Sequence, residues 1–197
     1  IDCRFPVQYV VRPQKDEFHD FRGYAGRIAG GVFKIGDDVT VLPSGFQSKI
    51  KSIETFNGSI DEAYAPMSIT LTLEDDIDVS RGDMIVRPKN QPEVIQDVEM
   101  MLCWMSETPL INRGKYTLKH TSKEARCMIK DIQYKVDINT LHRLEDDKEI
   151  KCNDIAKVTL RVTQPLFADQ YKDNRSTGSV IIIDEATNNT VGAGMIV

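Results

Sequence analysis

The polar run Asn174-Arg175-Ser176-Thr177, followed by Gly178, has the residue types needed to bind an anion or an acidic group in this 197-residue sequence. An arginine guanidinium presents a planar set of N–H donors that pairs with a phosphate or a carboxylate. Hydroxyls and a glycine beside it add donors and let the backbone approach an anion closely. The same run is also compatible with a plain loop that leads into an apolar strand over residues 180–183. We therefore predict Asn174, Arg175, Ser176 and Thr177 as candidates for an interface with a partner, with the plain loop as the alternative.

No nucleotide-binding or catalytic motif accompanies this run. A P-loop needs Gly-x-x-x-x-Gly-Lys-Ser/Thr so that backbone N–H groups surround the phosphates, and that spacing does not occur. The glycines that come nearest to it are Gly23, Gly26, Gly30 and Gly31. β-branched residues and Phe33 follow them where a dinucleotide fingerprint requires a helix, so we assign these glycines to bulges and tight bends of a barrel. A nucleophile elbow is also missing. We expect no catalytic, cofactor-binding or metal-binding residues in this chain.

Two kinds of charged motif have structural interpretations. Arg81-Gly82-Asp83 spells an adhesion tripeptide, but between Val79 and Met84 it predicts a hairpin corner with glycine at positive φ. The acidic runs over residues 74–78 and 145–148 lack the glycine and the distal glutamate of a calcium loop. We interpret both runs as solvated loops.

The cysteines and histidines show no metal-binding spacing. Four cysteines are spread along the chain without a C-x-x-C pair, at Cys3, Cys103, Cys127 and Cys152. They predict buried, reduced thiols, with a disulfide between the halves or a metal site as alternatives. Three isolated histidines stand at His19, His120 and His142. We expect them at the surface or in loops.

Charge and hydropathy argue against two classes of partner, although the charge totals leave a local basic patch open. The formal net charge is −5, and a division near Gln91 leaves 11 basic and 14 acidic residues before it and 14 and 16 after it. Neither half therefore attracts a nucleic acid through bulk electrostatics. No apolar run approaches the roughly 20 residues that span a bilayer, and no charged-then-apolar leader opens the chain. We expect a cytoplasmic protein that binds neither nucleic acid nor membrane. Since the sequence starts at Ile1 and not at Met, we expect a piece of a longer protein.

Short alternating segments separated by turns dominate both halves. The expected strands of the first half cover residues 7–11, 26–33, 38–42, 49–53 and 68–73, with a hairpin at Asn57-Gly58. Those of the second cover residues 94–105, 116–119, 128–136, 155–162, 180–183 and 190–197, the first of them buried on both faces. Residues 139–144 have the pattern of one helical turn. The polar segment 89–92 marks a boundary, so we predict an all-β chain of two consecutive small β-barrels, residues 1–91 and 92–197.

Several stretches occur in an order and spacing that match a known family. The first half contains Gly26-Arg27-Ile28-Ala29-Gly30-Gly31-Val32, Ile35-Gly36-Asp37-Asp38-Val39 and Leu42-Pro43-Ser44-Gly45. The second contains Trp104 after an apolar strand, Asp154-Ile155-Ala156 and a closing Thr190-Val191-Gly192-Ala193-Gly194-Met195-Ile196. The halves resemble the second and third domains of elongation-factor-type GTPases. The resemblance implies two barrels of the translation-factor GTPase type.

A narrower resemblance rests on four further stretches, Phe21-Arg22-Gly23-Tyr24-Ala25-Gly26, Ser80-Arg81-Gly82-Asp83, Arg175-Ser176-Thr177-Gly178 and Thr187-Asn188-Asn189-Thr190-Val191-Gly192-Ala193-Gly194-Met195. They are similar to the large, GTP-binding subunits of bacterial sulfate adenylyltransferase. This resemblance implies a parent enzyme that couples GTP hydrolysis to the synthesis of adenylyl sulfate from ATP and sulfate. GTP and magnesium would bind a GTPase domain outside this chain, and the partners would be that domain and a small catalytic subunit. The chain alone would be inactive. The alternative is a pair of tRNA-binding barrels from a translation factor.

Overall fold

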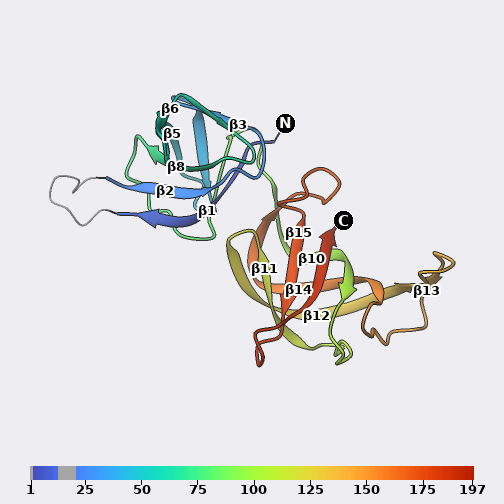
Figure 1. Ribbon diagram of the computed structural model, residues 1–197. Helices are drawn as coiled ribbons and strands as arrows, with labels where there is room; N and C mark the ends of the chain where they lie inside the picture. Colours follow the sequence, from blue (N-terminus) through green and yellow to red (C-terminus); the bar gives the residue numbers. More distant parts are fainter. Residues whose placement is uncertain (1, 13–20) are drawn as a thin grey trace. The chain divides into compact units, whose positions relative to one another are not determined.

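The computed structural model describes residues 2–12 and 21–197, which fall into two compact units, Ile1–Pro92 and Glu93–Val197. Within these described residues every regular element is a β-strand, and no helix occurs. Figure 1 shows the strands of each unit wrapped around a centre of their own. The predicted all-β fold is confirmed.

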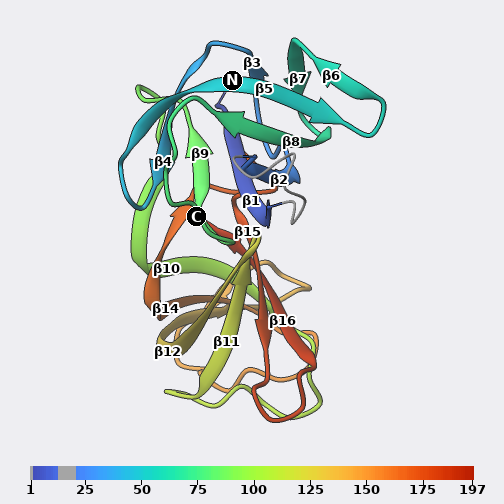
Figure 2. The same ribbon diagram turned by 90° about the vertical axis from the view of Figure 1, so that its left-hand side faces the viewer.

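The first unit is a closed antiparallel barrel. Its strands are β1 (Arg4–Val11), β2 (Gly23–Arg27), β3 (Val32–Lys34), β4 (Asp38–Leu42), β5 (Gln47–Thr55), β6 (Gly58–Ile60), β7 (Glu62–Tyr64), β8 (Ser68–Leu73) and β9 (Met84–Val86). The main sheet has the order β4-β9-β1-β2-β8-β5-β6, and β4 also pairs with β5, which closes six strands into a ring (Figure 2). Strands β3 and β7 form a separate small sheet. Closure leaves no free edge in the ring and so satisfies its backbone groups internally.

Apolar and polar residues alternate along the strands, and the apolar side chains fill the interior of this barrel. In β5, Ile50 and Ile53 are fully buried, whereas Lys49 and Lys51 face solvent. Successive strand residues point to opposite faces, so this pattern directs one face of β5 into the core. The largest side chains of the core come from several strands and from the loop after β2: Phe5, Tyr24, Ile28, Phe33 and Leu71.

The second unit is also a closed antiparallel barrel. Its strands are β10 (Glu93–Trp104), β11 (Lys115–His120), β12 (Lys123–Val136), β13 (Arg143–Leu144), β14 (Ile155–Ala168), β15 (Ser179–Ile183) and β16 (Thr190–Ile196). The sheet order is β11-β15-β16-β10-β14-β12-β13, and pairing of β11 with β12 closes the ring. Trp104 is 1% exposed and meets the Tyr116 ring edge-on, with 5.6 Å between the ring centroids. Its indole Nε1 donates to the Thr108 carbonyl.

The observed turns agree with the predictions, whereas two of the expected strands differ from them. Gly82 has φ +93°, as predicted for the corner after Val79, and Asn57-Gly58 forms the predicted turn between β5 and β6. The expected single strand over residues 26–33 is wrong. The strand conformation is interrupted between β2 and β3, where Gly31 has φ +75°. The expected burial of residues 94–105 on both faces is also wrong, since Val94 is 61% exposed.

The expected helical turn over residues 139–144 is wrong as well. The segment is a hydrogen-bonded turn followed by β13. The Asp137 carboxylate accepts the backbone N–H groups of Asn139 and Thr140, at 2.8 and 3.2 Å. Short polar side chains that bond nearby backbone groups in this way compete with helix formation.

Candidate partner-interface loop

The predicted polar run lies in the loop between β14 and β15, residues 169–178. The loop is folded by its own hydrogen bonds. The carbonyl of Gln170 accepts the N–H groups of Asp173 and Asn174, both at 3.0 Å. The Asn174 side chain then accepts the N–H groups of Ser176 and Thr177, at 2.9 and 3.2 Å. Asn174 therefore sets the shape of the turn.

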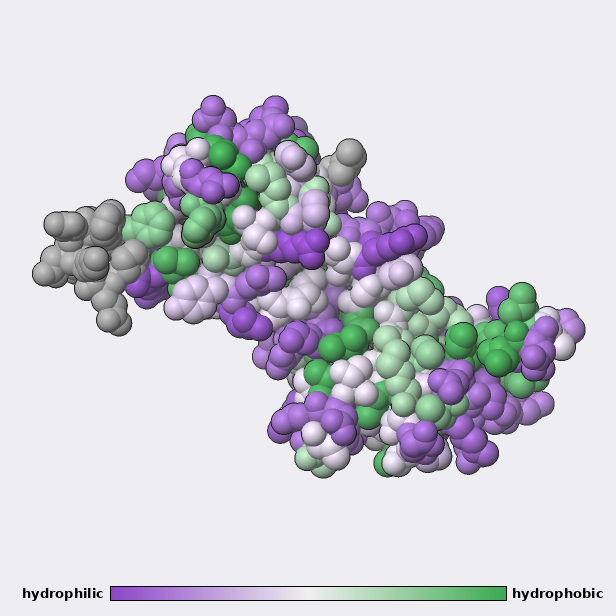
Figure 3. Space-filling view, viewed as in Figure 1, coloured by the Kyte–Doolittle hydropathy of each residue, from purple (hydrophilic) through white to green (hydrophobic). Residues whose placement is uncertain are grey.

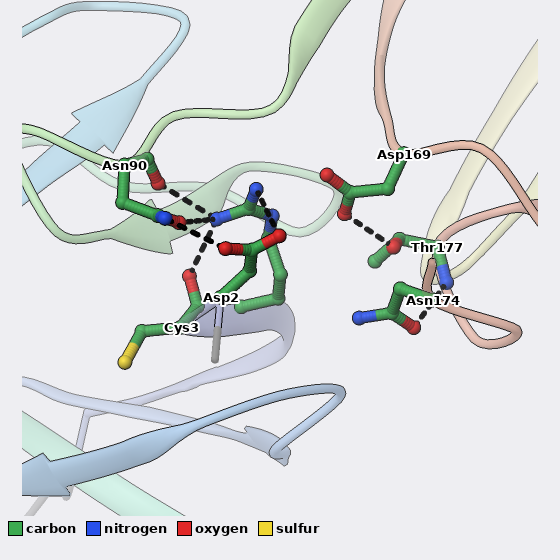
Figure 4. Close-up of polar contacts among 7 residues, drawn as sticks. Asp2, Cys3, Asn90, Asp169, Asn174 and Thr177 are labelled. Atoms are coloured by element: carbon green, nitrogen blue, oxygen red, sulfur yellow. Dashed lines mark hydrogen bonds and ion pairs between the residues drawn. The ribbon is translucent and has the colours of Figure 1, made fainter. Parts of the chain in front are cut away.

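Thr177 anchors the loop to the barrel. It is fully buried, and its hydroxyl donates to the Asp169 carboxylate at 2.6 Å. Figure 4 shows Thr177 between Asp169, whose carboxylate accepts from its hydroxyl, and Asn174, whose side-chain oxygen accepts from its N–H. The Thr177 carbonyl lies 2.6 Å from the Nε2 atom of His120 in β11. The hydroxyl and the carbonyl of Thr177 are thus both used inside the second unit.

Gly178 is required by close backbone packing. A Cβ atom at this position would lie 2.4 Å from the Cα of Tyr171 and 2.7 Å from the carbonyl oxygen of Asn174. The Gly178 N–H donates to that same carbonyl at 2.8 Å, and the Gly178 carbonyl accepts the N–H of Ile196 in β16. Any larger residue would force the loop away from the barrel.

The four candidate residues therefore divide into two pairs. Asn174 and Thr177 hold the loop together, whereas Arg175 and Ser176 are exposed on it. No carboxylate of the described residues lies within ion-pair distance of the Arg175 guanidinium. The loop thus presents the guanidinium of Arg175 and the hydroxyl of Ser176 on a hydrogen-bonded turn, which is suited to binding a carboxylate or phosphate group. Their role in an interface stays a prediction.

The buried position of His120 contradicts the prediction that this histidine lies at the surface or in a loop. It is 1% exposed and lies on the same inward face of β11 as Tyr116 and Leu118. Burial lowers the pKa of His120, and the bond to the Thr177 carbonyl opposes that effect only in part. Because a carbonyl accepts, Nε2 carries the hydrogen in this arrangement. The signal was available in the sequence, since Tyr116, Leu118 and His120 alternate with Lys115, Thr117 and Lys119. His142 is exposed as expected, and His19 lies outside the described residues.

The four cysteines are free thiols. Cys3 and Cys127 are buried as predicted, whereas Cys103 and Cys152 are half-buried. Burial raises the pKa of Cys127 to about 12, so this thiol is unreactive at neutral pH. Over residues 2–12 and 21–197 no three His, Cys, Asp or Glu side chains group closely enough to hold a metal ion. In the same ranges no helix has the length and apolar character needed to cross a membrane.

A second polar cluster, which the sequence did not indicate, lies in the first unit. Arg4 is 2% exposed, and its Nη1 donates to the backbone and side-chain oxygens of Asn90 at 2.7 and 2.8 Å. The Asn90 amide in turn donates to the Asp2 carboxylate at 2.6 Å (Figure 4). These contacts fasten the segment after β9 to the start of β1. An arginine beside Phe5 and Pro6 gives no sequence signal of burial.

Comparison with known proteins gives consistent matches. The GTP-eEF1A C-terminal domain-like family matches residues 97–197. Sulfate adenylyltransferase subunit 1 of Bacteroides thetaiotaomicron is 47% identical over 204 aligned residues, which cover all of this chain and 41% of that protein. The bifunctional enzyme CysN/CysC of Mycobacterium tuberculosis (strain H37Rv) is 46% identical over 197 residues, covering all of this chain and 32% of that enzyme. The chain thus spans between about a third and two fifths of these curated relatives.

Solved structures agree on the fold. Sup35 complexed with GDP has a TM-score of 0.87 at 15% identity, covering all of this chain and 47% of that one. Translation elongation factor SelB from Methanococcus maripaludis, in its apo form, has a TM-score of 0.77 at 17% identity, covering all of this chain and 42% of that one. At such low identity these likenesses show the architecture alone, that of the β-barrels in translation-factor GTPases.

Proposed function

Since this chain belongs to the GTP-eEF1A C-terminal domain-like family, we propose that it is the two-barrel region of a sulfate adenylyltransferase subunit 1. The whole protein would bind and hydrolyse GTP, with magnesium, in a domain outside this sequence. It would couple that hydrolysis to the synthesis of adenylyl sulfate from ATP and sulfate in the cytoplasm. The observation that carries the proposal is the 46–47% identity to such proteins over the full length of the chain.

In this proposal the chain binds a partner and transmits to it a change in orientation that starts in the GTPase domain. Residues 1–91 and 92–197 would be separate domains, and each contains a hydrophobic core of its own. Closed barrels are stiff, so they pass on a change of orientation without deforming. A partner that contacts the barrels differently in two states of the GTPase domain would then respond to the bound nucleotide. We propose that this partner is the second, catalytic subunit of the enzyme.

The loop over residues 169–178 gives the first test of the partner. Arg175→Glu is expected to weaken binding of the second subunit about tenfold, because an exposed guanidinium facing a partner carboxylate becomes a like charge. Isothermal titration calorimetry of this chain with the second subunit measures the change. Lys115→Glu, which makes the same charge change at the exposed start of β11, serves as the control. If Arg175→Glu and Lys115→Glu bind equally well, the loop is not part of the interface. If the unaltered chain does not bind, the proposed partner is wrong.

A second experiment separates this proposal from tRNA binding. GTP titrated into this chain is expected to release no heat, because the sequence contains no phosphate-binding loop. A gel-shift assay with tRNA at moderate salt is expected to show no tight complex, because both halves carry net negative charge. Micromolar GTP binding would contradict the assignment of GTP to another domain. Tight tRNA binding that weakens steeply with salt would favour a translation factor.

A further inference from the structure

The second unit carries a hairpin arm outside its ring of six strands. β12 runs to Val136 and pairs with the two-residue strand β13, with Lys135 opposite Leu144 and Val136 opposite Arg143. The turn between them, together with β13, covers residues 137–144, which we call the arm tip. Figure 1 shows β13 at the outer end of β12, away from the barrel. The arm tip is therefore accessible on the second unit.

Three large apolar side chains are exposed on this tip. Ile138 is 63% exposed, Leu141 77% and Leu144 37%. Figure 3 shows hydrophobic surface at the end of the second unit where Figure 1 places β13. Single exposed apolar residues are common, but three within seven positions form a patch.

The backbone presents Leu141 at an energetic cost. Its φ is +60°, a left-handed conformation that glycine and asparagine adopt more readily than leucine. The Leu141 N–H donates to the Asp137 carbonyl at 2.7 Å, and the Asp137 N–H donates to the His142 carbonyl at 2.9 Å. These bonds, with those from Asn139 and Thr140 to the Asp137 carboxylate, fix the turn. An exposed leucine held in a strained, hydrogen-bonded turn is positioned for contact with a partner and contributes little to the core.

Two unpaired carboxylates border the tip. Glu145 and Asp146 are exposed, and neither has an ion-pair or hydrogen-bond partner among the described residues. The neighbouring charges have contacts within the arm, and the exposed Arg143 guanidinium of β13 lies over the Tyr134 ring, 4.7 Å from its centroid. Asp147 pairs with Lys135 at 2.8 Å, and the Lys148 ammonium donates to the carbonyls of Ile132 and Gln133. With the two carboxylates of Glu145 and Asp146 against the one guanidinium of Arg143, the tip and its border combine an apolar surface with a net negative charge.

This combination selects the kind of partner. A second copy of this chain bound tip to tip would bring the Glu145 and Asp146 carboxylates of both copies together, which is unfavourable. Nucleic acids and anionic lipid surfaces would be repelled in the same way. The surface complementary to the tip is a protein with an apolar hollow that has lysine or arginine at its rim.

We propose that the arm tip inserts into such a hollow on the second subunit of sulfate adenylyltransferase, with Leu141 as the central anchor and Glu145 and Asp146 facing basic residues. The identity of this partner rests on the proposed function. Three side chains cover only part of the roughly 800 Å² per partner of a standard interface, so the tip would act as a small set of dominant contacts within a larger one.

Leu141→Gly tests the proposal, because a structural role and a binding role predict opposite results. Glycine suits φ +60° and removes the exposed side chain, so the melting temperature is expected to stay equal or rise. Affinity for the second subunit, measured by isothermal titration calorimetry, is expected to fall at least tenfold. Ile138→Ser should weaken binding similarly. The double variant Glu145→Lys/Asp146→Lys should slow association, and the effect should shrink at high salt.

The matched control is Ile111→Ser, because Ile111 lies in the same unit and is 61% exposed, close to the value for Ile138. It is expected to bind as the unaltered chain does. If the unaltered chain binds and Leu141→Gly and Ile138→Ser bind equally well, this inference is overturned while the proposed function stands. If the unaltered chain does not bind, the proposed partner is wrong and this inference falls with it. Self-association in analytical ultracentrifugation that Leu141→Gly abolishes would identify a second copy as the occupant and overturn the inference.

Discussion

Replacing Gly178 by alanine is expected to destabilise the second unit by about 3 kcal/mol, at the upper end of the usual cost of overpacking. The added Cβ would lie 2.4 Å from the Tyr171 Cα, 2.5 Å from the Tyr171 nitrogen and 2.7 Å from the Asn174 oxygen. All three are backbone atoms, so no side-chain rotation relieves the contact. The loop must move, and it then loses the Thr177 hydrogen bonds to Asp169 and His120.

Urea unfolding followed by tryptophan fluorescence measures this effect specifically. The chain has one tryptophan, Trp104, buried in the core of the second unit. The first unit therefore does not contribute to the signal. Ser176→Ala, an exposed position in the same loop, is the control and should change stability by less than about 0.5 kcal/mol. An unchanged unfolding midpoint for Gly178→Ala would show that the loop is not packed as described.

Lowering the pH from 7 to 5 is expected to destabilise the second unit through His120. Burial lowers the pKa of His120 in the folded chain, whereas an unfolded histidine has a pKa near 6.5. Below about pH 6.5 the unfolded state therefore binds a proton that the folded state resists. Stability from this group is full above that pH and is lost as the pH falls, at up to about 1.4 kcal/mol per pH unit. Asp169 favours the protonated ring and Lys123 opposes it.

His120→Leu separates the histidine from the other titrating groups. At pH 7 the variant is expected to lose about 2 kcal/mol, because the buried Thr177 carbonyl loses its donor. Its stability should then vary less between pH 7 and 5 than that of the unaltered chain, again by Trp104 fluorescence. His142→Gln, at an exposed position, should keep the original slope. An equal slope in His120→Leu would mean that His120 does not cause the acid sensitivity between pH 7 and 5; Asp137 and Asp184, whose pKa values are lowered by hydrogen bonds, affect stability only below about pH 5.

Much of the fold followed from local patterns in the sequence. Alternation such as that of Lys49, Ile50 and Lys51 predicts a strand with one buried face, and Asn57-Gly58 predicts a turn because glycine accepts positive φ. Closure of each ring by β4 with β5 and by β11 with β12 is a long-range pairing that no local pattern specifies. In β12 the register shifts between Ile129 and Asp131, so that Ile132 faces the core, and a strict alternation would have placed Asp131 there.

The candidate loop was less predictable, because adjacency in the sequence does not indicate which way each side chain points. Asn174 to Thr177 are four consecutive polar residues, and nothing in the sequence distinguishes the two that point inward from the two that are exposed. The turn directs Asn174 and Thr177 toward the backbone and leaves Arg175 and Ser176 outside, which depends on the shape of the loop. Arg4 was missed for a similar reason, since its buried position depends on Asn90, 86 residues away. The strained backbone at Leu141 has no sequence signature, because leucine is rarely found in that conformation.

The closed rings also explain how sequences can drift apart on this architecture. Each barrel satisfies the backbone of its six strands through pairing that belongs to the main chain and not to any particular side chain. Mutations on the outer faces therefore leave the frame intact, and only the packed interior and a few crowded glycines constrain it. Such a frame tolerates exterior changes that create new binding surfaces, and Sup35 and SelB share its shape at 15% and 17% sequence identity.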